Sequence, residues 1–358
     1  MPTPYNTGII GYGLSAKIFH IPFINDSAHF TLHSIVQRSP KPDNDAHTDH
    51  PTAKIYASTS DLLLDKDVHV IVITTAPDSH ASLATQAMKA GKHVIVEKPF
   101  TPTSEEARTL CDVARENGVF LTVYQNRRWD ADFLTLRKVL DEGSLGRVVE
   151  FESHFDRHRP VMPSVQSWKT DPAAYSAVFD LGTHLMDQVV SIYGLPKRIT
   201  GFVGTQRRNN TSGLEDSFTA LLHYDGGLTA TCKAGVVSPE TEQLRFWVRG
   251  EKGSYKKYHL DPQEGQLKEG LRPGQEGYGI ESEEKYGVLT KVEGGEMVSE
   301  KLKTVEGRGY TAFYDQFAKA LDAKDVGLLP VGSRVAADVI RLCELMRASS
   351  KEGRTLDV

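Results

Sequence analysis

The chain has 358 residues, of which 39% are hydrophobic and 25% are charged, and its formal net charge is −5. This composition is ordinary for a folded globular protein and excludes a disordered chain, a collagen-like repeat and a coiled-coil rod. The length predicts about two domains. The acidic balance argues against a nucleic-acid partner, and no apolar run reaches the roughly 18 residues that a membrane helix needs.

Cysteine usage points to a reducing compartment. Cys111, Cys232 and Cys343 lie too far apart for a metal-binding spacing, and their odd number does not suit a disulfide framework. The first six residues have neither the basic start nor the apolar segment of a secretory signal. We therefore expect a cytoplasmic protein without a bound metal.

Short apolar runs alternate with helical patterns in the first 125 residues. The clearest helix is Thr103–Asn117, which starts with a capping box formed by Thr103 and Glu106 and ends just before Gly118. This alternation predicts an α/β domain with a doubly wound parallel sheet. The predicted strands are Thr7–Ile10, Phe30–Gln37, Val68–Thr74, His93–Val96 and Val119–Tyr124.

The pattern changes after residue 127. Helices are predicted over Asp130–Glu142 and Ala177–Tyr193, and strands then follow one another without helices between them. Such a run predicts an α+β domain on a mostly antiparallel sheet, over residues 128–358. The expected strands are Arg198–Gly204, Ser217–Tyr224, Gly227–Ala234 and Leu244–Gly250, followed by surface loops over Gly265–Gly309 and by helices over Thr311–Ala323 and Gly332–Ser349, the last of which could pack back on the first domain.

A glycine-rich turn follows the first predicted strand. Gly11-Tyr12-Gly13-Leu14-Ser15-Ala16 fits the pattern G-x-G-x-x-G/A between a strand and a helix. The first glycine allows the tight turn, the second lets the backbone approach a diphosphate, and Ala16 is small enough for strand–helix packing. The diphosphate would bind free N–H groups at the helix N-terminus. The turn predicts a dinucleotide-binding domain over residues 1–127.

The end of the second predicted strand indicates which dinucleotide binds. An NAD site carries Asp or Glu there to accept a hydrogen bond from the ribose 2′-OH, whereas this chain reads Val36-Gln37-Arg38-Ser39. A guanidinium and a hydroxyl suit a 2′-phosphate, so Arg38 and Ser39 predict a preference for NADP. The alternative is that Arg38 is only a surface charge at the end of a strand.

Two further segments follow predicted strands at the same edge of the sheet. Glu97-Lys98-Pro99 comes after the strand His93–Val96, and Thr75-Ala76-Pro77-Asp78-Ser79-His80 comes after Val68–Thr74. Ligands of open α/β sheets bind beyond the carboxyl ends of the strands. The Lys98 ammonium would there stabilise negative charge that develops on a substrate oxygen; alternatively, Lys98 is an exposed loop lysine.

The segment Ala177–Tyr193 has an unusually narrow polar face. At about 100° per residue, its polar side chains fall within an arc of roughly 100°, and most of the remaining circumference is apolar. We predict a mostly buried helix in which Asp180 and His184 line a catalytic cleft, because buried carboxylate and imidazole groups need a partner or a wet cavity. The alternative is a solvent-facing stripe. The polar residues are Asp180, His184, Asp187, Gln188 and Ser191.

These motifs together resemble the glucose-fructose oxidoreductase/inositol dehydrogenase/MocA family, from about residue 7 to Arg354. The turn Gly11–Ala16, the segment Glu97-Lys98-Pro99 and the spacing of Asp180 and His184 occur in the family's order. Within the family, the segments 11–15, 124–130, 180–184 and 187–188 look most like NADP-dependent scyllo-inositol dehydrogenases. The resemblance implies a Rossmann domain followed by an α/β domain whose open sheet is often used for dimer contacts.

The resemblance also implies roles for single residues. His184 is the acid/base, Asp180 orients it or binds a substrate hydroxyl, and Lys98 stabilises the alkoxide; an imidazole suits its role because its unperturbed pKa lies near neutrality. The implied substrate-binding residues are Lys98, Asn126, Arg127, Arg159, Asp180 and His184, with a surface ion-pair role as the alternative for Arg159. The predicted cofactor-binding residues are Gly11, Tyr12, Gly13, Leu14, Ser15, Ala16, Arg38, Ser39, Thr75, Ala76, Pro77, His80, Glu97, Lys98, Asn126 and Trp168.

The chain departs from the family in two places. It reads Ala76-Pro77-Asp78 where family members often have Thr-Pro-Asn, and the polar stretch Pro40–His50 replaces part of a usually short link.

We therefore expect an NADP-dependent dehydrogenase or reductase that acts on a secondary alcohol or ketone of a cyclic polyol or sugar, as a homodimer or homotetramer formed through the second domain's sheet. The alternatives are a reductase of a diketone or dihydrodiol, and a non-catalytic NADP-sensing regulator on the same fold.

Overall fold

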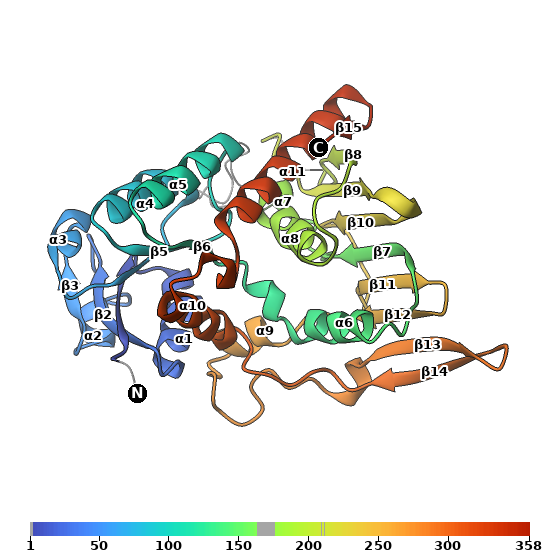
Figure 1. Cartoon of the computed structure of the whole chain (residues 1–358), viewed down its shortest axis with the longest axis horizontal. Coiled ribbons are helices and arrows are strands. Elements are labelled where there is room, and N and C mark those ends of the chain that lie inside the picture. Colours follow the sequence, from blue (N-terminus) through green and yellow to red (C-terminus); the bar gives the residue numbers. More distant parts are fainter. Residues whose placement is uncertain (1–2, 163–175, 209, 211) are drawn as a thin grey trace. The chain divides into compact units, whose positions relative to one another are not determined.

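A computed structural model describes residues 3–162, 176–208, 210 and 212–358, and each of its two sheets belongs to a separate unit (Figure 1). The first unit comprises Met1–Asn126, Gln263–Tyr278 and Arg308–Ala337. The second comprises Arg127–Pro262, Gly279–Gly307 and Asp338–Val358. Two segments from the C-terminal half of the chain therefore belong to the N-terminal unit.

The sheet of the first unit has six parallel strands in the order β3-β2-β1-β4-β5-β6. This is the strand order of dinucleotide-binding sheets, and it confirms the predicted doubly wound fold. The strand β3 was not predicted, because its three residues lie at the edge of the sheet and lack a buried apolar run. The strands are β1 (Tyr5–Ile10), β2 (Phe30–Val36), β3 (Lys54–Tyr56), β4 (Val70–Ile73), β5 (His93–Val96) and β6 (Leu121–Val123).

Helices cover both faces of this sheet. On one face α4 packs beside α5, and on the other α1 packs beside α10 (Figure 1). The capping box of Thr103 and Glu106 is formed at the start of α5. The α-helices are α1 (Ile21–Asp26), α2 (Ala46–Asp49), α3 (Thr59–Leu64), α4 (His80–Lys89), α5 (Ser104–Glu116), α9 (Gln263–Lys268) and α10 (Thr311–Ala323); shorter or irregular turns are η1 (Ala16–His20), η2 (Pro77–Ser79) and η7 (Val326–Leu328).

The helix α10 joins the first unit through a continuous buried face. Phe313, Tyr314, Phe317 and Leu321 recur at helical spacing and are buried. The Phe317 ring stacks on Phe30 of β2 with 6.2 Å between centroids. The burial of these apolar side chains thus packs α10, although it is late in the chain, against the N-terminal sheet.

The sheet of the second unit has nine strands in the order β14-β13-β12-β11-β7-β10-β9-β8-β15. Only β7 and β10 pair in parallel, so the predicted open, mostly antiparallel sheet is confirmed. The strands are β7 (Val148–His154), β8 (Arg198–Gly204), β9 (Ser217–His223), β10 (Thr229–Ala234), β11 (Leu244–Gly250), β12 (Gly253–Tyr258), β13 (Gly287–Glu293), β14 (Glu296–Leu302) and β15 (Leu356–Asp357).

The prediction of surface loops over Gly265–Gly309 is wrong. This range contains α9 and the hairpin of β13 and β14, whose turn is made by Gly294 and Gly295 with positive φ. All of β14 except its last residue is exposed, so it shows no alternation of apolar and polar residues that a sequence pattern could detect. Cross-strand pairing, rather than burial, defines this strand.

The predicted helix Ala177–Tyr193 is two helices, α7 (Ala177–Asp180) and α8 (Gly182–Tyr193). The Thr183 hydroxyl donates to the Phe179 carbonyl at 2.8 Å, a bond that competes with the regular backbone pattern and often bends helices. The predicted burial of α8 is confirmed, since every residue from Gly182 to Val190 is buried. The unit also contains α6 (Ala131–Asp141), most of α11 (Ser333–Glu352) and most of the short turn η3 (Asn126–Trp129), with the turns η5 (Asp225–Gly227) and η6 (Glu283–Lys285).

Among the described residues, no helix combines the length and apolar character needed to cross a membrane.

Candidate functional site

The glycine-rich turn has the geometry that a dinucleotide diphosphate needs. Gly11 has φ +100°, and a Cβ there would lie 3.1 Å from the side chains of Thr74 and Thr75. At Gly13 a Cβ would meet no described atom within 4 Å, so this side of the turn is open. Ala16 is fully buried, as the close packing of strand and helix requires. These residues fit a bound dinucleotide.

The stretch Pro40–His50 supports this turn from behind. The Asn44 amide donates to the Tyr12 carbonyl at 3.1 Å, and the Tyr12 hydroxyl donates to Asp49 at 2.6 Å. The Gln37 side chain binds the backbone of the same stretch, donating to the Asn44 carbonyl at 2.7 Å. Arg38 and Ser39 are exposed at the end of β2. This stretch therefore braces the turn, and Arg38 and Ser39 remain exposed.

The loop after β4 is tied to the loop after β5 by His80. Its fully buried ring lies 3.0 Å from the Thr75 carbonyl and 3.1 Å from the Pro99 carbonyl. Burial lowers the pKa of His80. The ring thus contacts backbone on both sides, which holds the segment Thr75–Pro77 beside the Lys98 loop.

Glu97 and Lys98 follow β5 at the same edge. The buried Glu97 accepts hydrogen bonds from the Lys98 backbone N–H at 2.9 Å, from His20 Nε2 at 3.0 Å and from the Ser15 hydroxyl. The Lys98 side chain is half-buried. The first unit therefore brings the glycine-rich turn and the Glu97–Lys98 segment into direct contact.

In the second unit, Asp180 and His184 lie on either side of the break between α7 and α8. Asp180 is half-buried at the end of α7, and His184 is 5% exposed in the first turn of α8. Asn126 and Arg127, which join the two units along the chain, are both buried. Asp180 and His184 thus lie close together in sequence, at the end of α7 and the start of α8.

The rest of the predicted polar face serves the packing of α8. Asp187 accepts two hydrogen bonds of 2.7 Å from Arg128. Gln188 donates to the Arg127 carbonyl at 2.7 Å and accepts from Arg245 at 2.7 Å. The sequence did not single out Arg245 or its ion-pair partner Asp132 (3.1 Å), both 1% exposed. Paired, buried charges explain why α8 carries polar residues next to its catalytic candidates.

Two remaining candidates stand apart. Arg159 is exposed, and its backbone donates to the Val236 carbonyl at 2.7 Å while its own carbonyl accepts from Arg207 at 2.7 Å. Trp168 lies outside the described residues.

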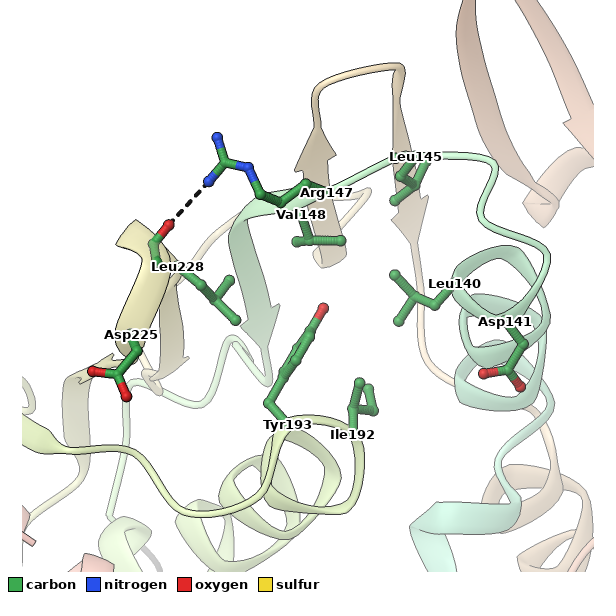
Figure 2. Close-up of a pocket in the computed structure, with 11 residues that line it drawn as sticks. Leu140, Asp141, Leu145, Arg147, Val148, Ile192, Tyr193, Asp225 and Leu228 are labelled. Atoms are coloured by element: carbon green, nitrogen blue, oxygen red, sulfur yellow. Dashed lines mark hydrogen bonds between the residues drawn. The ribbon is translucent and has the colours of Figure 1, made fainter.

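A cavity of about 460 Å³ in the second unit lies at the other end of α8 (Figure 2). Ile192 and Tyr193 line it, and the Tyr193 ring extends from the helix end toward Val148. At 1.5 Å per residue, Tyr193 is roughly 13 Å from His184 along the helix. This cavity is therefore separate from the candidate residues Asp180 and His184.

The fold and the turn geometry define a dinucleotide-binding protein, and comparisons with known proteins place it among oxidoreductases. A model described as "Oxidoreductase family, NAD-binding Rossmann fold" matches residues 5–125, and the "GFO/IDH/MocA C-terminal domain" matches residues 133–256. The chain belongs to the Gfo/Idh/MocA family of oxidoreductases.

Several relatives match over nearly the whole chain. The oxidoreductase YdgJ of Escherichia coli is 41% identical, over 98% of this chain and 97% of that protein. The scyllo-inositol 2-dehydrogenase (NADP(+)) IolW of Bacillus subtilis is 34% identical, over 98% and 94%. The solved structure of the Bacillus subtilis oxidoreductase YvaA superposes with a TM-score of 0.91 at 33% identity, covering 99% of this chain and 100% of that one.

Proposed function

We propose that the protein is an NADP-dependent dehydrogenase or reductase that acts on a secondary alcohol or ketone of a cyclic polyol or sugar. The observation that carries this proposal is the open glycine-rich turn held directly against the Glu97–Lys98 segment. The similarity to a scyllo-inositol dehydrogenase supports the substrate class. In this proposal the first unit binds the cofactor and the second unit binds the substrate.

Each catalytic candidate has a role that its side chain can perform. The bound dinucleotide would supply the hydride chemistry. Lys98 stabilises negative charge on the substrate oxygen, and His184 exchanges the hydroxyl proton. Asp180 orients His184 or binds a neighbouring hydroxyl. Such groups must be held in position to be effective, and both His184 and Glu97, which precedes Lys98, are buried.

The proposed cofactor contacts come from the carboxyl ends of the strands of the first unit. The glycine-rich turn binds the diphosphate, and Arg38 and Ser39 bind the 2′-phosphate. The rim segment Thr75–Pro77, with His80 behind it, and Asn126 complete the site in this proposal.

We expect the KM for NADP to be at least about tenfold below that for NAD, because a charge-assisted hydrogen bond from Arg38 adds roughly 1.5–3 kcal/mol. Arg38→Ala should raise the KM for NADP by about the same factor and leave the KM for NAD unchanged. Steady-state kinetics with both cofactors measure this, and NAD serves as the internal control. Equal or better use of NAD by the unmodified protein contradicts the assignment.

A substrate screen tests the reaction itself. Inositols, aldoses and their keto forms are incubated with each cofactor, and the absorbance of the reduced nicotinamide is followed. We expect turnover of a polyol or sugar. Turnover confined to diketones or dihydrodiols would replace the proposed substrate class, and NADP binding without any turnover would favour a regulator.

We further propose a cytoplasmic homo-oligomer formed through the sheet of the second unit. Phe202 on β8 is 61% exposed and Met297 on β14 is 82% exposed, so a large apolar side chain is open to solvent near each end of the sheet. The free cysteines are buried thiols, which suits a reducing compartment. Sedimentation of the full chain should give a dimer or tetramer, and replacing Phe202 and Met297 with Ser should shift it toward monomer. A monomeric unmodified protein contradicts the proposal.

A further inference from the structure

A chain of buried polar groups lies behind the Lys98 loop in the first unit. His20, at the end of η1, has its Nε2 3.0 Å from Glu97 Oε1 and its Nδ1 2.6 Å from the hydroxyl of Tyr314 on α10. His20 and Tyr314 are fully buried, and Glu97 is 8% exposed. Three segments that are distant in sequence therefore meet in one network away from solvent.

The hydrogen bonds of this network fit one arrangement of protons. Burial raises the pKa of Glu97, but the hydrogen bonds from His20 and Ser15 and the positive charge of Lys98 outweigh burial and leave that pKa below its ordinary value. An ionised carboxylate only accepts hydrogen bonds, so His20 carries a proton on Nε2 and donates it to Glu97.

The other ring nitrogen of His20, Nδ1, then accepts the hydrogen bond from the Tyr314 hydroxyl. Burial raises the pKa of Tyr314 well above its ordinary value, so its hydroxyl keeps its proton. If His20 Nδ1 were also protonated, the Tyr314 O–H would have no acceptor among the described residues. The chain thus runs from the Tyr314 hydroxyl to neutral His20 and on to Glu97.

Glu97 connects this chain to two functional segments at once. One carboxylate oxygen accepts from the Ser15 hydroxyl in the glycine-rich turn, and the other accepts from the Lys98 backbone N–H at 2.9 Å. The carboxylate therefore fixes the start of the Lys98 loop relative to the turn.

We propose that Glu97, oriented by His20 and Tyr314, is a positioning group that sets the placement of Lys98 relative to the glycine-rich turn. Tyr314, 294 residues from His20 in sequence, is its remote anchor. The inference rests on the proposed function, because it assigns a purpose to the position of Lys98. Hydrogen-bonded supporting groups of this kind orient a reacting group without touching the substrate.

The structure offers a matched pair of variants for the test. Tyr314→Phe removes the hydroxyl that binds His20. Tyr124→Phe removes a buried hydroxyl from the same cluster, since the Tyr124 ring centroid lies 4.3 Å from that of His20, but this hydroxyl has no hydrogen-bond partner among the described residues. A purely packing role would make the two variants behave alike.

We expect Tyr314→Phe to lower kcat about tenfold, because small misplacements of a reacting group reduce rates strongly. Its dissociation constant for NADP and its KM for substrate should stay near those of the unmodified protein, and Tyr124→Phe should keep its kcat. Steady-state kinetics and titration calorimetry measure these quantities. Equal kcat values for Tyr314→Phe and the unmodified protein would overturn the proposal.

Side-chain ¹⁵N NMR of the histidines gives a readout that does not depend on activity. We expect one buried histidine in the neutral form protonated on Nε2, whose Nδ1 resonance shifts in Tyr314→Phe but much less in Tyr124→Phe. A doubly protonated His20, or no change in Tyr314→Phe, overturns the network. Failure of the proposed function gives a different result. In that case Lys98→Met has the same kcat as the unmodified protein, while the histidine resonances appear as expected.

Discussion

Lys98→Met is expected to lower kcat about a hundredfold or more, because it removes the positive charge proposed to stabilise the substrate oxygen as its charge develops. Met keeps the length and apolar stem of the side chain, so packing at the half-buried position changes little. The dissociation constant for NADP should change no more than a few-fold, since the glycine-rich turn is untouched. Steady-state kinetics and calorimetric titration separate the two quantities.

Lys89→Met is the matched control for this prediction. Lys89 is exposed at the end of α4 in the same unit, and its replacement removes one positive charge without touching the turn or the Lys98 loop. We expect the kcat of Lys89→Met to equal that of the unmodified protein. A kcat for Lys98→Met equal to that of Lys89→Met would remove Lys98 from the catalytic set.

His184→Ala is expected to lower kcat by a factor of about 10² to 10⁴, the range that a positioned proton-transfer group contributes. His184 lies in the buried first turn of α8, so its loss leaves a space that a small base can enter. Added imidazole should therefore restore part of the rate, in proportion to its concentration. The dissociation constant for NADP should again remain within a few-fold.

His223→Ala provides the comparison in the second unit. The ring Nε2 of His223 on β9 lies 2.9 Å from the Thr200 hydroxyl oxygen. The proposed reaction does not use this contact within the sheet. The kcat of His223→Ala should not change when imidazole is added. Proton transfer by His184 would be refuted if His184→Ala were as active as His223→Ala. It would also be refuted if His184→Ala were folded and inactive, and added imidazole restored no activity.

Local patterns were sufficient wherever burial follows a regular period. The strand His93–Val96 and the helix Thr311–Ala323 have the predicted bounds, because each has a continuous or helical apolar pattern. The strands β7 and β14 were missed for different reasons. β7 lies in the middle of the second sheet, yet its sequence VVEFESH is mostly polar, while β14 is almost wholly exposed.

The sequence by itself determined the dinucleotide-binding turn and the parallel sheet around it, and it singled out Lys98, Asp180 and His184 as candidates. Such features depend on residues close together in the chain, where glycine positions, strand ends and helix spacing carry the information.

Only the tertiary structure decided which distant groups pair. It returned α10 to the first unit and placed Tyr314 on His20, and it set Arg245 against Asp132 and Gln188. A buried polar side chain must find a partner, because leaving it unsatisfied costs free energy. Which partner it finds depends on how separate elements pack, and no local pattern records that choice.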